Sequence, residues 1–200
     1  MSNQEENQVL VFADKLVNET NSSIFLTGKA GTGKSTFLRK IAKESEKSLV
    51  VLAPTGIASI NARGQTIHSF FKIPFGPLQP ADARLRKIRF KPEQTTIIEN
   101  LELLIIDEIS MVRADLLDAI DYLLRKIRKV SLPFGGVQIL LVGDLFQLEP
   151  VVPREEAVFL DNFYDSPYFF SAWVFNEIDI FNLELQKIYR QTDPLFIGLL

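Results

Sequence analysis

The chain has 200 residues, 46% of them hydrophobic, which is enough for the buried core of one α/β domain. Its formal net charge of −3 gives no overall positive field for nucleic acid, so any such contact depends on a local basic patch. There is no cysteine and only one histidine, which excludes a disulfide framework and thiolate metal sites and predicts oxygen ligands for any bound metal ion.

The first residues, MSNQEENQ, are polar and acidic and lack the basic-then-apolar order of a signal peptide. No apolar run approaches the roughly 18 residues of a membrane span. We therefore expect a soluble intracellular protein without a membrane partner, cytoplasmic in a bacterial or viral form and nuclear or mitochondrial in a eukaryotic one. Apolar residues at helical spacing predict an amphipathic helix over residues 5–18.

The stretch SIFLTGKAGTGKSTF, residues 23–37, joins a strand pattern to a helix pattern through a glycine-rich turn. The turn reads G-x-x-x-x-G-K-S, which is the phosphate-binding loop of ATP-binding proteins. Backbone N–H groups curl around the phosphates there, and the following helix points its positive end at them. Lys34 is expected to reach the β- and γ-phosphates, and the Ser35 hydroxyl to ligate Mg²⁺. The predicted nucleotide cradle comprises Gly28, Ala30, Gly31, Thr32, Gly33, Lys34, Ser35 and Thr36.

A buried strand is predicted over residues 49–53 and a short helix over residues 55–62. The segment GQTIHSFF then leads into residues 72–92, which are rich in proline and hold a basic cluster, and which we expect to form a surface excursion. His68, beside two phenylalanines, could line a nucleic-acid path where bases stack on aromatic rings. A packed histidine on a core-facing turn is the alternative.

A helix is predicted over residues 92–101 and a strand over residues 103–106, which ends in Asp107 and Glu108. The carboxyl ends of parallel strands meet at one edge of a sheet, so these acids are expected beside the phosphate loop. Asp107 would then hold Mg²⁺ through its water shell, and Glu108 would orient the attacking water. The alternative is an acid pair that caps the next helix.

A helix over residues 114–130, a turn over residues 133–136 and a fourth strand over residues 137–142 follow. Gln147, just beyond that strand, could contact the γ-phosphate or be an ordinary turn residue. Residues 168–175 predict a buried aromatic helix with Trp173 in the core, and residues 178–185 a fifth strand. Arg190 is a candidate transition-state cation or a solvated side chain. Alternating strands and helices predict a parallel sheet covered on both faces, with ligands outside the carboxyl ends of its strands.

Five motifs, in order, resemble those of the petite-integration-frequency (PIF) DNA helicases of superfamily 1, which are related to RecD. They are GKAGTGKS, APTGIAS with GQTIHSFF, LLIIDEISMV, LLVGDLFQLEPV and IYRQ. Residues 121–138, DYLLRKIRKVSLPFGGVQ, resemble the signature sequence of that family. The resemblance implies a P-loop NTPase with a RecA-like parallel sheet, which uses ATP and Mg²⁺ to move 5′ to 3′ on single-stranded DNA. It also implies unwinding of forked and G-quadruplex DNA, roles in DNA repair, recombination and telomere maintenance, and action as a monomer.

By position, the resemblance assigns each candidate residue a role. Gln8, with Phe12 four residues later, is similar to the adenine-recognising glutamine motif; Lys34, Ser35, Asp107 and Glu108 match the phosphate, magnesium and water residues; Gln147 matches the γ-phosphate sensor and Arg190 the fourth-motif arginine; Thr55, Gly56, His68 and Phe71 lie in segments similar to the DNA-contacting ones. Glu149 stands where the family usually has proline.

Nothing in the sequence resembles the later motifs of a second RecA-like domain, and residues 193–200 read as the start of a helix. We expect residues 1–200 to be the first motor domain, as an N-terminal fragment or a shortened chain. A P-loop ATPase of another class, such as a ring-forming replication loader, is the alternative, and a non-catalytic module that keeps nucleotide binding is a third. ATP turnover that rises steeply with single-stranded DNA favours the helicase.

Overall fold

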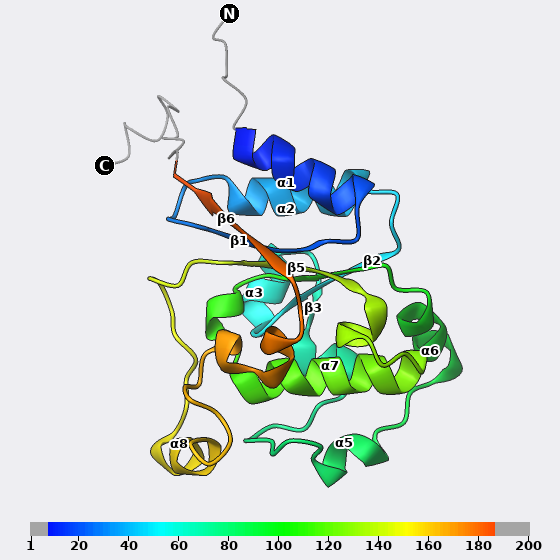
Figure 1. Ribbon diagram of the computed structural model, residues 1–200, viewed down its shortest axis with the longest axis vertical. Helices are drawn as coiled ribbons and strands as arrows, with labels where there is room; N and C mark the ends of the chain where they lie inside the picture. Colours follow the sequence, from blue (N-terminus) through cyan, green and yellow to red (C-terminus); the bar gives the residue numbers. More distant parts are fainter. Residues whose placement is uncertain (1–7, 187–200) are drawn as a thin grey trace, which may run out of the picture.

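The computed structural model describes residues 8–186, which form a six-stranded sheet between two layers of helices (Figure 1). The strand order is β3-β2-β4-β5-β1-β6, and every neighbouring pair is parallel. The strands are β1 (Ser23–Gly28), β2 (Leu49–Ala53), β3 (Gln65–Thr66), β4 (Leu103–Ile106), β5 (Gln138–Gly143) and β6 (Ile180–Leu185). The predicted parallel α/β fold is confirmed.

Eight α-helices and four short 3₁₀ turns connect these strands within the described residues. The helices are α1 (Gln8–Glu19), α2 (Lys34–Glu44), α3 (Gly56–Asn61), α4 (Ile67–Phe71), α5 (Ala83–Lys87), α6 (Pro92–Glu99), α7 (Ala114–Arg128) and α8 (Arg154–Leu160). The 3₁₀ turns are η1 (Ile109–Met111), η2 (Pro133–Gly136), η3 (Phe169–Ser171) and η4 (Trp173–Asn176). None of the described helices has the length and apolar character that crossing a membrane requires.

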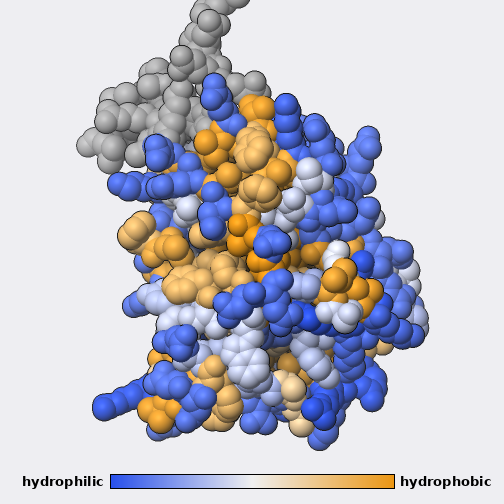
Figure 2. Space-filling model, viewed as in Figure 1, coloured by the Kyte–Doolittle hydropathy of each residue, from blue (hydrophilic) through white to orange (hydrophobic). Residues whose placement is uncertain are grey.

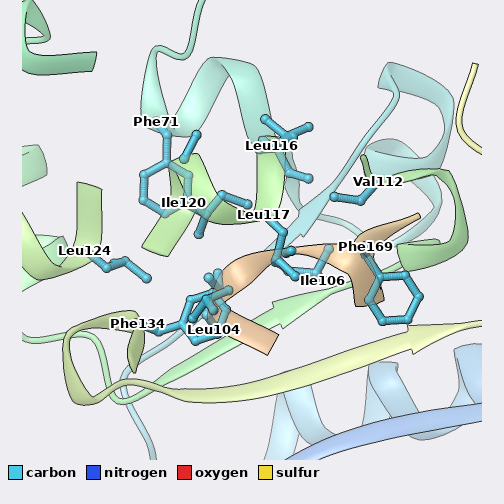
Figure 3. Close-up of a cluster of buried hydrophobic side chains, with 14 of the residues drawn as sticks. Phe71, Leu104, Ile106, Val112, Leu116, Leu117, Ile120, Leu124, Phe134 and Phe169 are labelled. Carbon is cyan, nitrogen blue, oxygen red and sulfur yellow. The ribbon is translucent and has the colours of Figure 1, made fainter. Parts of the chain in front are cut away.

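Two hydrophobic cores lie on opposite faces of the sheet because successive strand residues point to opposite sides. Leu103 and Ile105 of β4 pack in the core beneath α1 and α2. Leu104 and Ile106 pack in the other core, against α4, α6 and α7 (Figure 3). Both faces of β4 and β5 are therefore buried, which explains why their sequences are continuous apolar runs.

The signature-like segment, residues 121–138, comprises the second half of α7, the turn η2 and the first residue of β5, and hydrogen bonds hold these parts together. Asp121 accepts hydrogen bonds from Arg125 Nε (2.8 Å) and from the backbone N–H of Phe134 (2.5 Å). The Arg128 guanidinium donates from Nε to the Gly135 carbonyl, and its Nη1 lies within 2.9 Å of the carbonyls of Ile98, Glu99 and Leu101 at the end of α6. These polar residues hold α6, α7 and η2 together at the amino ends of the strands, whereas the phosphate loop lies at their carboxyl ends.

Residues 168–175 do not form the predicted buried helix. They form η3 and η4, joined through Ala172 in an extended conformation. The Asp118 carboxylate of α7 accepts the backbone N–H groups of both Trp173 and Val174 (3.0 Å each), which replaces the bonds that a continuous helix would make. Trp173 is 51% exposed rather than in the core, and its indole N–H donates to the Phe163 carbonyl.

Residues 72–92 are also less peripheral than expected. Ile73, Leu78 and Leu85 are buried in the α7 core, although the basic residues between them are exposed. The two-residue strand β3 and the short helices α5 and α8 were not predicted, because elements of two to seven residues carry too little periodicity to read.

The face seen in Figure 2 carries apolar side chains in its upper middle part, around the edge strand β6 and beside α1. Phe181 of β6 and Phe12 of α1 are about half exposed, and their rings meet edge to face with centroids 6.4 Å apart. This contact joins the predicted adenine-side helix to the edge of the sheet.

Candidate active site

The phosphate loop runs from the carboxyl end of β1 to the first turn of α2. A Cβ on Gly28, whose φ is +150°, would lie 2.6 Å from the Leu185 carbonyl oxygen, so only glycine fits between β1 and β6. Lys34 Nζ donates to the carbonyls of Gly28 (2.5 Å) and Lys29 (3.1 Å), and the buried Thr32 hydroxyl also donates to Lys29 (2.8 Å). The ammonium group of Lys34 thus bonds the backbone of the loop that it belongs to.

The outer side of the loop is open to solvent. Ala30, Gly31, Ser35 and Thr36 are exposed, whereas Thr32 is buried beneath them. Gly33 has a φ of +101° and precedes Lys34, the first residue of α2. Backbone N–H groups at this helix start and the Ser35 hydroxyl are therefore accessible, as a phosphate cradle requires.

The two carboxylates predicted beside the loop follow β4. The Asp107 N–H donates to the Leu52 carbonyl of β2, and the Asp107 carboxylate accepts the Glu108 N–H (3.0 Å). Glu108 has a left-handed backbone (φ 51°, ψ 44°), which is unfavourable for a side chain with a Cβ and is common at functional sites. Its side chain makes no hydrogen bond to the following turn, so the helix-cap alternative is not supported.

Both carboxyl groups are less acidic than in water. Burial raises the pKa of Asp107, and burial together with the charges of Asp107 and Asp144 raises the pKa of Glu108. Lys34 opposes both shifts through its positive charge. The phosphate-loop lysine is therefore close enough to act as the counter-charge of the acid pair.

Gln147 is held by Asp144, which lies in the predicted strand-end cluster of residues 144–147 but was given no role of its own. The carboxylate of Asp144, which is only 4% exposed, accepts the side-chain amide of Gln147 (2.9 Å) and the backbone N–H of Phe146 (3.0 Å). Asp144 therefore positions Gln147 at the end of β5. A carboxylate directly after an apolar strand was the signal for such a positioning role.

One hollow of about 680 Å³ collects the ends of four elements. Its walls include Ser35, Asp107, Glu108 and Gln147, together with Thr55 at the end of β2. The structure thus brings together the predicted metal, water and sensor residues. Arg39 of α2, Asn61 of α3 and Met111 of η1 also line the hollow and were not predicted.

Three of the predicted DNA-contacting residues, Thr55, Gly56 and His68, differ in what surrounds them: Thr55 caps a helix, Gly56 has open space around it and His68 stacks on an aromatic ring. The Thr55 hydroxyl accepts the Ala58 N–H (3.2 Å) and so caps α3. Gly56 has no positive φ, and a Cβ there would meet nothing within 4 Å, so the fold itself does not require glycine at this position. His68 is half-buried and stacks on Phe75, with ring centroids 4.7 Å apart.

The prediction that Phe71 contacts DNA needs correction. Its ring is fully buried and points into the α7 core that also holds Ile120 (Figure 3). The last residues of α4 face the sheet because the helix is only five residues long and packs its apolar side inward. The Phe71 ring therefore has no exposed face for a base.

Two further candidates lie apart from the hollow. Gln8 is exposed at the start of α1 and shares a shallow depression of about 420 Å³ with Val11, Phe12 and Lys15. It does not line the hollow of the acid pair. Arg190 lies outside the described residues.

Comparison with known proteins decides the family. A sequence model of PIF1-like helicases matches residues 1–195. The chain belongs to the PIF1-like helicase family. It is 39% identical over 188 residues to the ATP-dependent DNA helicase PIF1 of Saccharomyces cerevisiae (strain YJM789), covering 91% of this chain and 21% of the relative.

Solved structures of PIF1-like helicases share the fold. A Pif1 helicase from Bacteroides in complex with ADP-AlF₃ and single-stranded DNA superposes with a TM-score of 0.87 at 46% identity, covering 96% of this chain and 44% of that one. A second Pif1 structure, which concerns unwinding of forked double-stranded DNA by two coordinating helicases, has the same TM-score and identity and is covered to 46%. The chain therefore has the RecA-like P-loop fold, and it spans less than half the length of these relatives.

Proposed function

We propose that this chain is an ATP-hydrolysing motor domain of a DNA helicase that moves 5′ to 3′ on single-stranded DNA. The observation that carries the proposal is the hollow that joins Ser35, Asp107, Glu108 and Gln147 with Thr55. Nucleotide-handling residues and a predicted DNA-contacting residue share its walls. Membership of the PIF1-like family supports the same conclusion.

In this proposal the loop residues hold the ATP phosphates. Lys34 exchanges its bonds to the Gly28 and Lys29 carbonyls for bonds to phosphate oxygens, and the exposed N–H groups of the loop bind the rest. Glu108 orients the attacking water and accepts a proton from it as the water oxygen attacks phosphorus, a role that its raised pKa favours. Gln147, steadied by Asp144, contacts the γ-phosphate.

The donor set fits Mg²⁺. The Ser35 hydroxyl and the Asp107 carboxylate, both oxygen donors, line the same hollow. Among residues 8–186 no group of three or more His, Cys, Asp or Glu side chains could hold a metal, and Mg²⁺ is typically bound by one or two protein oxygens plus phosphate and water. When bound, the ion neutralises charge on the phosphates.

Single-stranded DNA, in our proposal, crosses the surface that carries Thr55, Gly56 and His68. The open space around Gly56 supports this path, because a phosphate can approach its backbone more closely than it could approach a larger residue. We further propose that residues 1–200 correspond to the first motor domain of such helicases and that the protein acts as a monomer on DNA inside the cell. Forked and G-quadruplex DNA are the proposed substrates.

ATP turnover with and without single-stranded DNA tests the proposal. We expect ATP turnover to rise steeply when single-stranded DNA is added. The Glu108→Gln variant should bind ATP as tightly as the parent chain but hydrolyse it several orders of magnitude more slowly. Glu99→Gln, an exposed acid on α6, is the matched control and should leave turnover unchanged. Turnover indifferent to DNA would support an ATPase of another class.

A further inference from the structure

Phe75 lies on the loop after α4 and leaves most of its ring in solvent. The residue is 82% exposed, and its ring is stacked nearly parallel to His68, with an interplanar angle of 18°. One face of the ring is therefore covered by the imidazole and the other is open. Exposing an aromatic ring forfeits roughly 2 kcal/mol of hydrophobic stabilisation, so the fold itself gains little from this arrangement.

The imidazole beneath the ring is kept uncharged. Burial and the nearby Arg113 lower the pKa of His68, and Asp115 only partly opposes them. At neutral pH the two stacked rings therefore form a neutral, flat support. Its outer face is an aromatic surface of the kind on which bases stack.

The loop that carries Phe75 is fixed rather than loose. Arg113 Nη2 donates to the Gly76 carbonyl (2.7 Å), and the fully buried carboxylate of Asp115 accepts the Leu78 N–H (2.9 Å). Arg113 and Asp115 also pair with each other through two bonds of 2.9 Å. The ring is consequently held in place before any ligand arrives, which lowers the entropy lost on binding.

The segment that carries this ring is basic although the whole chain is acidic. Residues 72–91 contain six Lys or Arg and one acid, a net charge of +5 in a chain of net charge −3. The segment is folded back on itself, since Lys72 Nζ bonds the Arg89 carbonyl and Arg84 bonds the Pro77 carbonyl. An open aromatic face on a basic segment suits a base attached to a phosphate backbone.

We propose that Phe75 is a stacking platform for one base of single-stranded DNA, supported from below by His68, with the basic segment 72–91 receiving the adjoining phosphates. This inference rests on the proposed function, because it assumes that the protein binds single-stranded DNA. It assigns the aromatic contact to Phe75, while the neighbouring Phe71 belongs to the core.

Binding of a fluorescent oligothymidylate of about 15 nucleotides tests the platform. Phe75→Ala should weaken binding about 5- to 150-fold, which corresponds to the roughly 1–3 kcal/mol lost when a base-stacking aromatic is removed. Phe75→Trp should keep the affinity, and Phe75→Leu, which retains bulk but no π-face, should lose most of it. Leu132→Ala, an equally apolar change at an exposed residue (62%) before β5, is the matched control and should have no effect.

Oligonucleotides that lack a single base identify the contact. When the abasic site is moved along the strand, one position should weaken DNA binding by the parent chain. The same abasic position should not weaken DNA binding by Phe75→Ala any further. The slope of log Kd against log salt should be the same for both chains, because stacking releases no counterions. Melting temperatures should also agree, since the ring is mostly in solvent.

The outcomes separate the two proposals. If the parent chain binds no single-stranded DNA and its ATP turnover ignores DNA, the proposed function fails. If the parent chain binds DNA but Phe75→Ala and Phe75→Leu bind it equally well, the platform is refuted and the function stands. A loss of affinity that no abasic position reproduces also refutes stacking.

Discussion

Arg128 offers the sharpest test of what the signature-like segment does. Its guanidinium bonds four carbonyls: Gly135 from Nε, and Ile98, Glu99 and Leu101 from Nη1. The contacts to Gly135, Ile98 and Leu101 are partly buried, so those three oxygens would lose their partner in Arg128→Met, whereas the exposed Glu99 carbonyl would bind water. At about 1 kcal/mol for each, the free energy of unfolding should fall by about 3 kcal/mol.

The change should be visible in urea or thermal unfolding. For a domain of this size about 3 kcal/mol corresponds to a drop in Tm of roughly 6–12 °C. The Tm of Arg128→Lys should lie about midway between those of the parent chain and Arg128→Met, because one ammonium group cannot reach the end of α6 and Gly135 at once. Lys43→Ala, an exposed basic residue in the last turn of α2, is the control and should change stability by less than about 0.5 kcal/mol.

ATP affinity of the folded Arg128→Met chain should match the parent, since the segment lies at the amino ends of the strands and the phosphate loop at their carboxyl ends. Stability within about 0.5 kcal/mol of the parent would refute the clamp. A loss of ATP affinity without a loss of stability would instead place Arg128 in the nucleotide machinery.

Three more outcomes follow from the site. Lys34→Ala should weaken ATP binding about 10- to 100-fold in a calorimetric titration, because the phosphates lose a charged donor, and equal affinity would count against its role. The pKa of Glu108 is raised above its usual 4.5, so the stability this group contributes is present below that pH and is lost as pH rises through the raised pKa. Glu108→Gln should therefore be more stable than the parent by about 1 kcal/mol at pH 7 and by less at pH 4, and a gain confined to low pH would contradict the sign. Gly56→Ala should keep the Tm and weaken single-stranded DNA binding several-fold in fluorescence anisotropy, while unchanged binding would move the DNA path away from α3.

The sequence predicted the parts of the site that follow buried strands. Residues 103–106 and 138–143 are fully buried in the structure, and such runs end at the carboxyl edge of a parallel sheet wherever the chain places them. Asp107, Glu108 and Gln147 could therefore be assigned to one edge before any coordinates. The phosphate loop was specified by its own residues, since each glycine answers a local backbone need.

Which side chains face solvent between the strands could not be predicted. The stretch FFKIPF holds three rings; Phe70 and Phe71 are buried, and Phe75, beyond the left-handed Lys72 (φ 55°) that ends α4, is exposed. The role of the half-buried Asp118 could not be predicted either, because its carboxylate accepts N–H groups that lie 55 and 56 residues away. Contacts over such sequence separations leave no periodic pattern to read.

The position of β1 in the sheet sets the order in which the nucleotide site can form during synthesis. β1 emerges from the ribosome early, yet its two neighbours, β5 and β6, come from the last third of the chain. Gly28, the first residue of the phosphate loop, rests against Leu185 of β6. A nascent chain therefore carries the complete phosphate-loop motif long before the loop has its flanking strands. The nucleotide site is therefore completed only after β5 and β6 have been made and have paired with β1.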